Sequence, residues 1–195
     1  MTDTITADPV ARYVGGRDFR NLIGGEFVEA SDGSTSEVVD PSTGSTVSEV
    51  PESSAADVEA AVESARRAQP GWEALGVEGR SACFARFGEL LQQRREEMAM
   101  LDAIDSGNPV KAMRIDVDIC MPYIDGWPAM ARTLRGEVIP ASPGNLHYTS
   151  YRPYGVVGRI TAFNHPAMFA ARVLTSGASP ASSESTRKMR SCEDA

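Results

Sequence analysis

The sequence has 195 residues, of which 42% are hydrophobic and 24% are charged, as in an ordinary soluble globular protein. Its formal net charge of −8 comes from 19 basic and 27 acidic residues, and because such a surface repels phosphate backbones, nucleic acid is not expected as a partner. Three widely separated cysteines and two histidines exclude a disulfide framework and leave too few ligands to predict a metal site.

The N-terminal segment is polar, and we expect residues 1–20 to form a flexible arm. It lacks the basic stretch and the following apolar core of a signal peptide, and no apolar run in the chain reaches the length of a membrane span. A cytoplasmic protein without a membrane partner is therefore the expectation.

Two pairs of short apolar runs predict β-hairpins in the residues that follow. A Gly-Gly pair separates residues 21–23 from residues 26–28, and both turn positions of such a hairpin need positive φ. Residues 37–39 and 46–50 flank the segment 40–44, in which Asp, Pro and Gly each favour a turn.

Apolar residues at helical spacing predict two helices after the hairpins. The first begins at Ser54, where Asp57 completes a capping box, and ends at Pro70. The second is long and covers about residues 78–106. It ends at Gly107, which suits the left-handed geometry of a helix C-cap.

A third helix is predicted over roughly residues 110–134. Pro122 and Pro128 fall inside it, so we expect a kink or a break there. Cys83 and Cys120 are interpreted as buried thiols on helices. The apolar positions of the third helix include Met113, Val117, Cys120, Ile124 and Trp127.

From there the pattern changes to strands. Residues 148–152 alternate as in a strand, and residues 155–162 form a short apolar run typical of a buried parallel strand. Residues 164–166 then predict a tight turn, followed by the start of a helix at residues 167–173. A strand, a tight turn and a helix open a nucleotide-binding β-α unit.

Five segments, in the right order along the chain, together resemble the aldehyde dehydrogenase superfamily. They are similar to its opening hairpin, its N-P-x-T/S-G turn, its E-x-x-D-x-G-K-P segment, its R-E-P-x-G-V-V-G-x-I segment and its P-W-N-x-P element. In chain order they occupy residues 21–27, 40–44, 101–109, 152–160 and 161–166. The fourth lacks the Glu, Asn108 stands where Lys is usual, and Ala162 and Phe163 replace Pro and Trp.

The resemblance covers about residues 21–171 and implies the N-terminal part of an α/β fold, with hairpins, a helical layer and the first strand of a Rossmann-like sheet. Residues 172–195 depart from the family pattern. They contain eight Ser or Thr and no aromatic residue, so we predict an atypical, disordered tail. We expect a chain truncated before the family's catalytic cysteine, through a frameshift or a broken gene, and inactive alone.

The resemblance implies oxidation of an aldehyde to a carboxylic acid with NAD or NADP as cofactor. In the family, a cysteine thiolate attacks the carbonyl carbon, hydride passes to the nicotinamide, and a glutamate activates the water that hydrolyses the thioester. Negative charge develops on the carbonyl oxygen, so a fixed hydrogen-bond donor aimed there lowers the barrier.

Asn164 matches the family's side-chain oxyanion donor, because an amide donates a hydrogen bond without carrying a charge. The alternative is a turn residue that bonds its own backbone. The strand end before Asn164 matches the lining of the family's cofactor groove, since ligands bind at the carboxyl ends of strands in open α/β sheets, although a plain core strand would use the same residues. These candidate cofactor-binding residues are Ile160, Thr161, Ala162 and Phe163.

Cys192 is rejected as the nucleophile, because it lies in the anomalous tail beside Glu193 and Asp194, whose negative charge disfavours a thiolate. His165 is interpreted as a turn residue rather than a general base. The family's catalytic glutamate and cofactor lysine match nothing in the chain. The intact family forms homo-oligomers through strands that match residues near 146–152, so the alternative function is a non-catalytic fragment that pairs with an intact dehydrogenase subunit.

Overall fold

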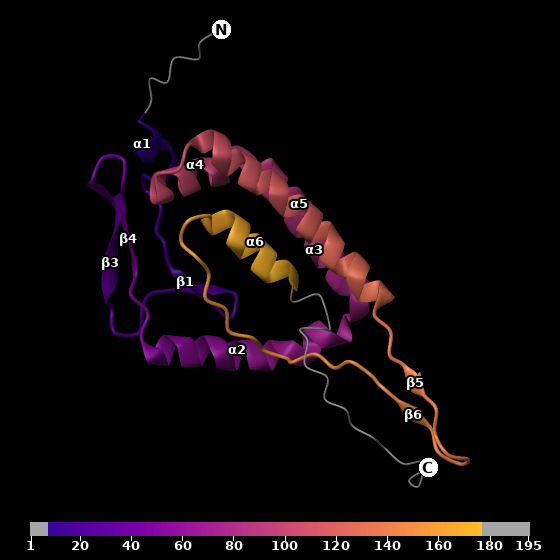
Figure 1. Ribbon diagram of the computed structural model, residues 1–195. Helices are drawn as coiled ribbons and strands as arrows, with labels where there is room; N and C mark the ends of the chain where they lie inside the picture. The colour runs from indigo at the N-terminus through magenta and orange to yellow at the C-terminus, as the bar shows by residue number, and fades with distance from the viewer. Residues whose placement is uncertain (1–7, 177–195) are drawn as a thin grey trace.

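The computed structural model describes residues 8–176 of the chain. In chain order its elements are α1 (Pro9–Tyr13), β1 (Asn21–Ile23), β2 (Glu26–Val28), β3 (Thr35–Asp40), β4 (Ser45–Pro51), α2 (Ala55–Ala74), α3 (Gly76–Gln93), α4 (Arg95–Ser106), α5 (Val110–Thr133), β5 (Val138–Ile139), β6 (His147–Tyr148) and α6 (Pro166–Ser176). α5 packs against α3, α4 and α6, and α6 lies beneath α4 and α5 in Figure 1. α2 lies apart from this group, below α6 in this view, with the β3–β4 hairpin at the left and the β5–β6 hairpin extending to the lower right.

Both hairpins predicted near the N-terminus are confirmed. β1 pairs with β2 in antiparallel fashion, and Gly24 and Gly25 between them adopt φ angles of 66° and 88°. β3 pairs with β4 around a turn in which Gly44 has a φ of 73°. Only glycine adopts positive φ without strain, so these turns are determined by local sequence alone.

Part of the segment predicted as a flexible arm, residues 1–20, has regular structure within the described residues. Residues 9–13 form α1, and Val14 directly after it is buried. Arg17 then forms an ion pair with Glu97 on α4, which ties the segment to the central helices. Polar composition did not reveal this contact because the partner lies far along the chain. Residues 1–7 lie outside the described residues.

α2 begins at the predicted capping box. The Asp57 carboxylate accepts hydrogen bonds from the backbone N–H groups of Ser54, at 2.8 Å, and of Ser31, at 2.9 Å. The helix does not end at Pro70, as predicted, but continues to Ala74. Pro70 lies on the exposed side of the helix, so water can bond the carbonyl that loses its amide partner.

Acidification is expected to weaken the start of α2. The backbone N–H of Ser54, assisted by Ser31, holds the pKa of Asp57 below its ordinary value despite the opposing effect of burial. A carboxyl whose pKa is lower in the folded chain stabilises the fold above its unfolded pKa, and this contribution is lost as the pH falls through the folded pKa. Urea unfolding measures the free energy of unfolding at neutral and at strongly acid pH. Between these two pH values it should fall less in Asp57→Ala than in the wild type.

The matched control for this pH dependence is Glu59→Ala, because Glu59 is exposed on the same helix. It should lose as much stability on acidification as the wild type. Identical acid sensitivity of Asp57→Ala and the wild type would contradict the assignment.

The long helix predicted over residues 78–106 is in fact two helices. The chain bends at Arg94, with a φ of −105° and a ψ of 17°, before α4 begins. Residues 94–97 are all charged, so a continuous helix would have no apolar side chain to bury at this point. The bend therefore removes no contact from the hydrophobic core. Two bidentate ion pairs, Arg95–Asp118 and Glu96–Arg114, fasten the bend to α5. The predicted end at Gly107 is confirmed by its φ of 72°.

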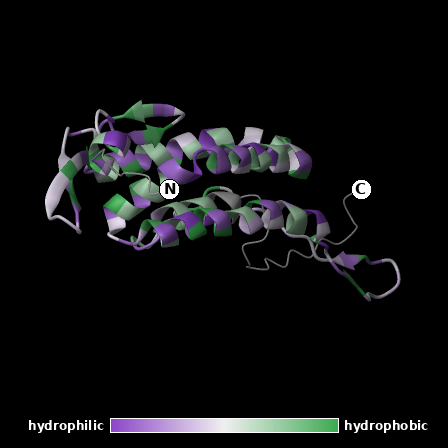
Figure 2. Ribbon diagram, turned by 90° about the horizontal axis from the view of Figure 1, so that it is seen from above, coloured by the Kyte–Doolittle hydropathy of each residue, from purple (hydrophilic) through white to green (hydrophobic). Residues whose placement is uncertain are grey.

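α5 is the central helix, and its predicted apolar face is confirmed. The helices of Figure 2 alternate between apolar and polar residues, as amphipathic helices do when they bury one face. α5 continues through Pro122 and Pro128, so the predicted break does not occur. Packing against three helices outweighs the two hydrogen bonds that the prolines remove. The largest fully buried side chains are those of Met113, Val117, Cys120 and Ile124.

The buried strand predicted over residues 155–162 does not form. These residues have no strand partner within the described range, and Val157 and Ile160 are exposed. Of the strand predicted just before them, only Tyr148 forms part of β6, which pairs with β5. A strand needs a neighbour for its N–H and C=O groups, and an apolar run alone does not supply one.

α6 runs to Ser176, so residues 172–176 of the segment predicted as a disordered tail are helical. Residues 177–195 lie outside the described residues. Among the helices of residues 8–176, none is both long and apolar enough to cross a membrane.

Candidate functional site

Asn164 lies in the exposed bend that leads into α6, rather than at the end of a formed strand. Its backbone carbonyl accepts a hydrogen bond from Nδ2 of Asn108 at 2.8 Å. Within residues 8–176, no group hydrogen-bonds the side-chain amide of Asn164, so the alternative in which this amide bonds its own turn is not seen. The backbone is therefore held while the amide remains able to donate to a ligand.

Two buried carboxylates hold the residues that follow Asn164. Asp116 on α5 has Oδ2 at 2.5 Å from Nδ1 of His165, and Asp102 on α4 accepts a hydrogen bond from the N–H of Ala167 at 2.9 Å. Only 5% of Asp102 and 7% of Asp116 is exposed. His165 lies in the bend, as predicted, but its ring is paired inward with α5.

Sequence reasoning missed both carboxylates because their partners lie 49 and 65 positions away. The one signal for Asp102 was its place in a segment, residues 101–109, that resembles a family motif. Asp116 sits among the apolar residues of α5, where spacing suggested only a core helix.

Asp102 caps α6 from another helix. Burial raises the pKa of Asp102, the Ala167 N–H opposes this by stabilising the charge, and the carboxylates of Asp105 and Asp116 raise it further. The first N–H groups of a helix have no partner inside the helix, and negative charge is favoured at this end. A long-range carboxylate therefore does for α6 what a local N-cap side chain does for most helices.

The four residues predicted to line the cofactor groove directly precede Asn164 in the chain. All four are exposed, and the side chains of Ile160 and Phe163 are almost entirely so. They follow one another along the surface and are not assembled into a groove with another described element. In chain order they are Ile160, Thr161, Ala162 and Phe163.

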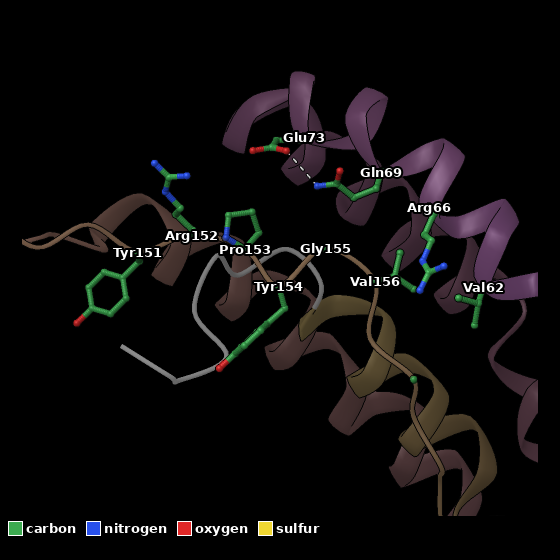
Figure 3. A pocket seen from close by; sticks show the side chains of 11 residues that line it. Val62, Arg66, Gln69, Glu73, Tyr151, Arg152, Pro153, Tyr154, Gly155 and Val156 are labelled. Atoms are coloured by element: carbon green, nitrogen blue, oxygen red, sulfur yellow. Dashed lines mark hydrogen bonds between the residues drawn. The ribbon is translucent and has the colours of Figure 1, made fainter. Parts of the chain in front are cut away.

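An open hollow of about 790 Å³ lies elsewhere, between α2 and residues 151–158. Figure 3 shows Arg66, Gln69 and Glu73 on its α2 side, where Nε2 of Gln69 donates to Glu73 at 3.0 Å. Sequence reasoning could not predict it, because it joins segments that are far apart in the chain. It includes neither Asn164 nor the cofactor candidates, and no group of three His, Cys, Asp or Glu in residues 8–176 is arranged to hold a metal ion.

The two described cysteines differ in environment. Cys120 is buried, as predicted, but Cys83 is exposed, because it lies on the outer face of α3 beside the buried Phe84. Burial raises the pKa of Cys120 to about 11, and the nearby carboxylates of Asp116 and Asp102 add to the effect. Cys120 is therefore unsuited to act as a thiolate nucleophile.

Cys120 is expected to resist alkylation by iodoacetamide at neutral pH, because its thiolate is rare and its sulfur is inaccessible. Peptide mapping by mass spectrometry should find Cys83 modified in the native chain and Cys120 modified only after denaturation. Cys83→Ser is the control and should leave Cys120 equally protected. Similar rates of alkylation at Cys83 and Cys120 in the native chain would contradict the protection of Cys120.

The aldehyde dehydrogenase family model matches residues 27–177, well over half of the chain. The chain belongs to the aldehyde dehydrogenase family. The match extends beyond Ala171, where the resemblance was expected to stop. Aldehyde dehydrogenase tropH of Talaromyces stipitatus is 38% identical over 117 residues, which make up 58% of this chain and 23% of that protein.

Solved structures, aldehyde dehydrogenases among them, share the fold. PnpE from Pseudomonas sp. WBC-3 matches with a TM-score of 0.79 and 33% identity, over 84% of this chain and 34% of that one. The NAD+ complex of aldehyde dehydrogenase from Bacillus cereus matches with a TM-score of 0.81 and 28% identity, over 88% of this chain and 35% of that one. The predicted fold class, a portion of the mixed helix-and-strand aldehyde dehydrogenase fold, is confirmed, and the chain spans about a third of the length of these structures.

Proposed function

We propose that this chain supplies the oxyanion donor and part of the nicotinamide site of an NAD(P)-dependent aldehyde dehydrogenase, which converts an aldehyde to a carboxylic acid. The observation that carries the proposal is Asn164. Its amide is exposed and has no partner among the described residues, while its backbone is hydrogen-bonded to Asn108. Such an arrangement suits a fixed donor that waits for a substrate oxygen.

In the proposed reaction, a cysteine thiolate other than the three cysteines of this sequence attacks the aldehyde carbon. The carbonyl oxygen gains negative charge, and Nδ2 of Asn164 donates a hydrogen bond to it. Because a primary amide does not titrate, this donor stays in place while protons move elsewhere in the site. Bound nicotinamide supplies the hydride acceptor.

The residues before Asn164 fit one wall of the cofactor site. They are exposed, adjacent to the proposed donor, and mostly apolar, so they can contact a flat ring and exclude water from its surface. We therefore assign cofactor contact to Ile160, Thr161, Ala162 and Phe163.

The 195-residue chain is proposed to be inactive alone. Cys120 is buried with a raised pKa, Cys83 lies on the exposed face of α3, and Cys192 stands beside two acidic residues that disfavour a thiolate. The family's catalytic glutamate has no counterpart in the sequence. A donor without a nucleophile or a hydrolytic base cannot complete the reaction.

A chimera tests the proposal. Residues 27–171 of this chain replace the matching segment of the Bacillus cereus enzyme, and NAD(P)H formation is followed with a panel of aldehydes. We expect turnover by the chimera and none by the 195-residue chain. A chimera that folds and binds NAD+ but oxidises no aldehyde would contradict the proposal, as would steady turnover by the chain alone.

A second candidate function is a non-catalytic fragment that pairs with an intact dehydrogenase subunit, as the homo-oligomers of the family suggest. Exposed apolar side chains at Val138, Val157 and Ile160 favour it, because a partner subunit could bury apolar surface that the described residues leave uncovered. Co-purification with a full-length relative, lost in Val138→Asp, would support this function. The absence of any complex would rule it out.

A further inference from the structure

Three side chains from the α4–α5 region hold the bend that carries Asn164. Asn108 holds the carbonyl of Asn164, Asp116 holds the ring of His165, and Asp102 holds the N–H of Ala167. We propose that these anchors, Asp102, Asn108 and Asp116, are positioning residues that orient the side chain of Asn164. The inference rests on the proposed function for the use of this orientation, but the orientation itself can be measured without turnover.

The anchors act on positions 164, 165 and 167, so they hold the bend at three closely spaced points. A backbone held in this way has little freedom to rotate, and the direction of the Asn164 Cα–Cβ bond follows from it. Only the two side-chain torsions of Asn164 remain free. A donor is effective when its supporting residues remove such freedom before the substrate arrives.

The burial of two of the anchor side chains explains why their hydrogen bonds to the bend are stable. Asp102 and Asp116 are more than nine-tenths buried, and a buried carboxylate without a hydrogen-bond donor is strongly unfavourable. Each therefore favours the conformation in which the bend provides its donor, the Ala167 N–H or the His165 ring. The bend cannot swing away without leaving these acids unpaired.

The third anchor is fixed by the connection between α4 and α5. Gly107, with a φ of 72°, lies so close to β3–β4 that an added Cβ would be 2.8 Å from Cγ of Pro41. The backbone N–H of Asn108 also donates to Oγ of Ser106 at 3.3 Å. The backbone at Asn108 is therefore restricted, and this restriction keeps its side-chain amide next to the carbonyl of Asn164.

Selective ¹⁵N-asparagine labelling of the whole 195-residue chain tests the inference by NMR. The side-chain amide signals are few enough to assign by substitution, and the melting midpoint of every variant is measured in parallel.

We expect Asn108→Ala and Asp116→Ala to move the side-chain signals of Asn164. Asp116→Asn keeps an acceptor for His165, so in this variant the signals should stay at their wild-type positions. Asn145→Ala is the matched control, because its amide bonds locally to Ser142. The chain has four asparagines: Asn21, Asn108, Asn145 and Asn164.

If the anchors only stabilised the fold, their substitution would lower the melting midpoint without a specific shift of the Asn164 side-chain signals. We instead expect the Asn164 signals to move in Asn108→Ala while its melting midpoint stays close to that of the wild type. If Asp116→Ala does not fold, Asn108→Ala decides the matter alone. Unchanged Asn164 signals in Asn108→Ala would overturn the inference. Since no turnover is measured, this failure is distinct from an inactive chimera, which would count against the proposed function.

Discussion

In the chimera, Asn164→Ala is expected to lower kcat by on the order of 100- to 1,000-fold, the usual effect of removing one oxyanion donor. The Asn164 amide would bond the alkoxide more strongly than the neutral carbonyl, so its loss should raise the barrier to attack and leave substrate binding nearly unchanged. KM should therefore change little while kcat falls.

Asn145→Ala in the same chimera is the control for this prediction, because Asn145 lies in the turn between β5 and β6 and bonds Ser142. It should leave kcat at the value of the unmodified chimera. A chimera whose kcat does not depend on Asn164 would remove the basis for the oxyanion assignment, even with the fold intact.

Ile124→Ala is expected to lower the free energy of unfolding of the chain by about 2–5 kcal/mol, the range for truncating a large buried aliphatic side chain. Ile124 is 1% exposed at the centre of α5 and belongs to a cluster with Phe84 and Leu91 of α3. A Cβ added at Gly88 would lie 3.2 Å from Cγ2 of Ile124, which shows how closely α3 and α5 approach. The surrounding helices cannot collapse into the space that the truncation leaves without giving up other contacts.

Ile119→Ala provides a control on the same helix, because Ile119 is 40% exposed. Its effect should be well below that of Ile124→Ala, since a surface substitution usually changes stability by no more than about 0.5 kcal/mol. Urea unfolding followed by circular dichroism measures both. Equal destabilisation by the two substitutions would contradict the position of α5 at the centre of the fold.

Features that depend on neighbouring residues were predictable from the sequence. The glycines of both hairpins need positive φ, and Asp57 caps α2 through a donor three positions away. The face of α5 from Met113 to Ile124 follows directly from helical spacing. In each of these cases the contacts that determine the structure lie within a few residues or on one helix face.

Features that depend on distant contacts were not predictable. Pro122 and Pro128 did not break α5, because packing against three helices outweighs their local preference. Residues 155–162 have strand composition but no neighbouring strand in the described part of the chain. In the candidate site, the resemblance singled out Asn164, whereas the carboxylates that hold its bend became visible only when the helices were assembled.

In the assembled enzyme, we expect the amide of Asn164 to face the aldehyde oxygen. A crystal structure of the chimera with an aldehyde substrate bound tests it most directly. Nδ2 of Asn164 should lie within about 2.7–3.1 Å of that oxygen, with the backbone carbonyl of Asn164 still bonded to Asn108. An aldehyde oxygen held by other donors, with the Asn164 amide turned away from it, would contradict the account.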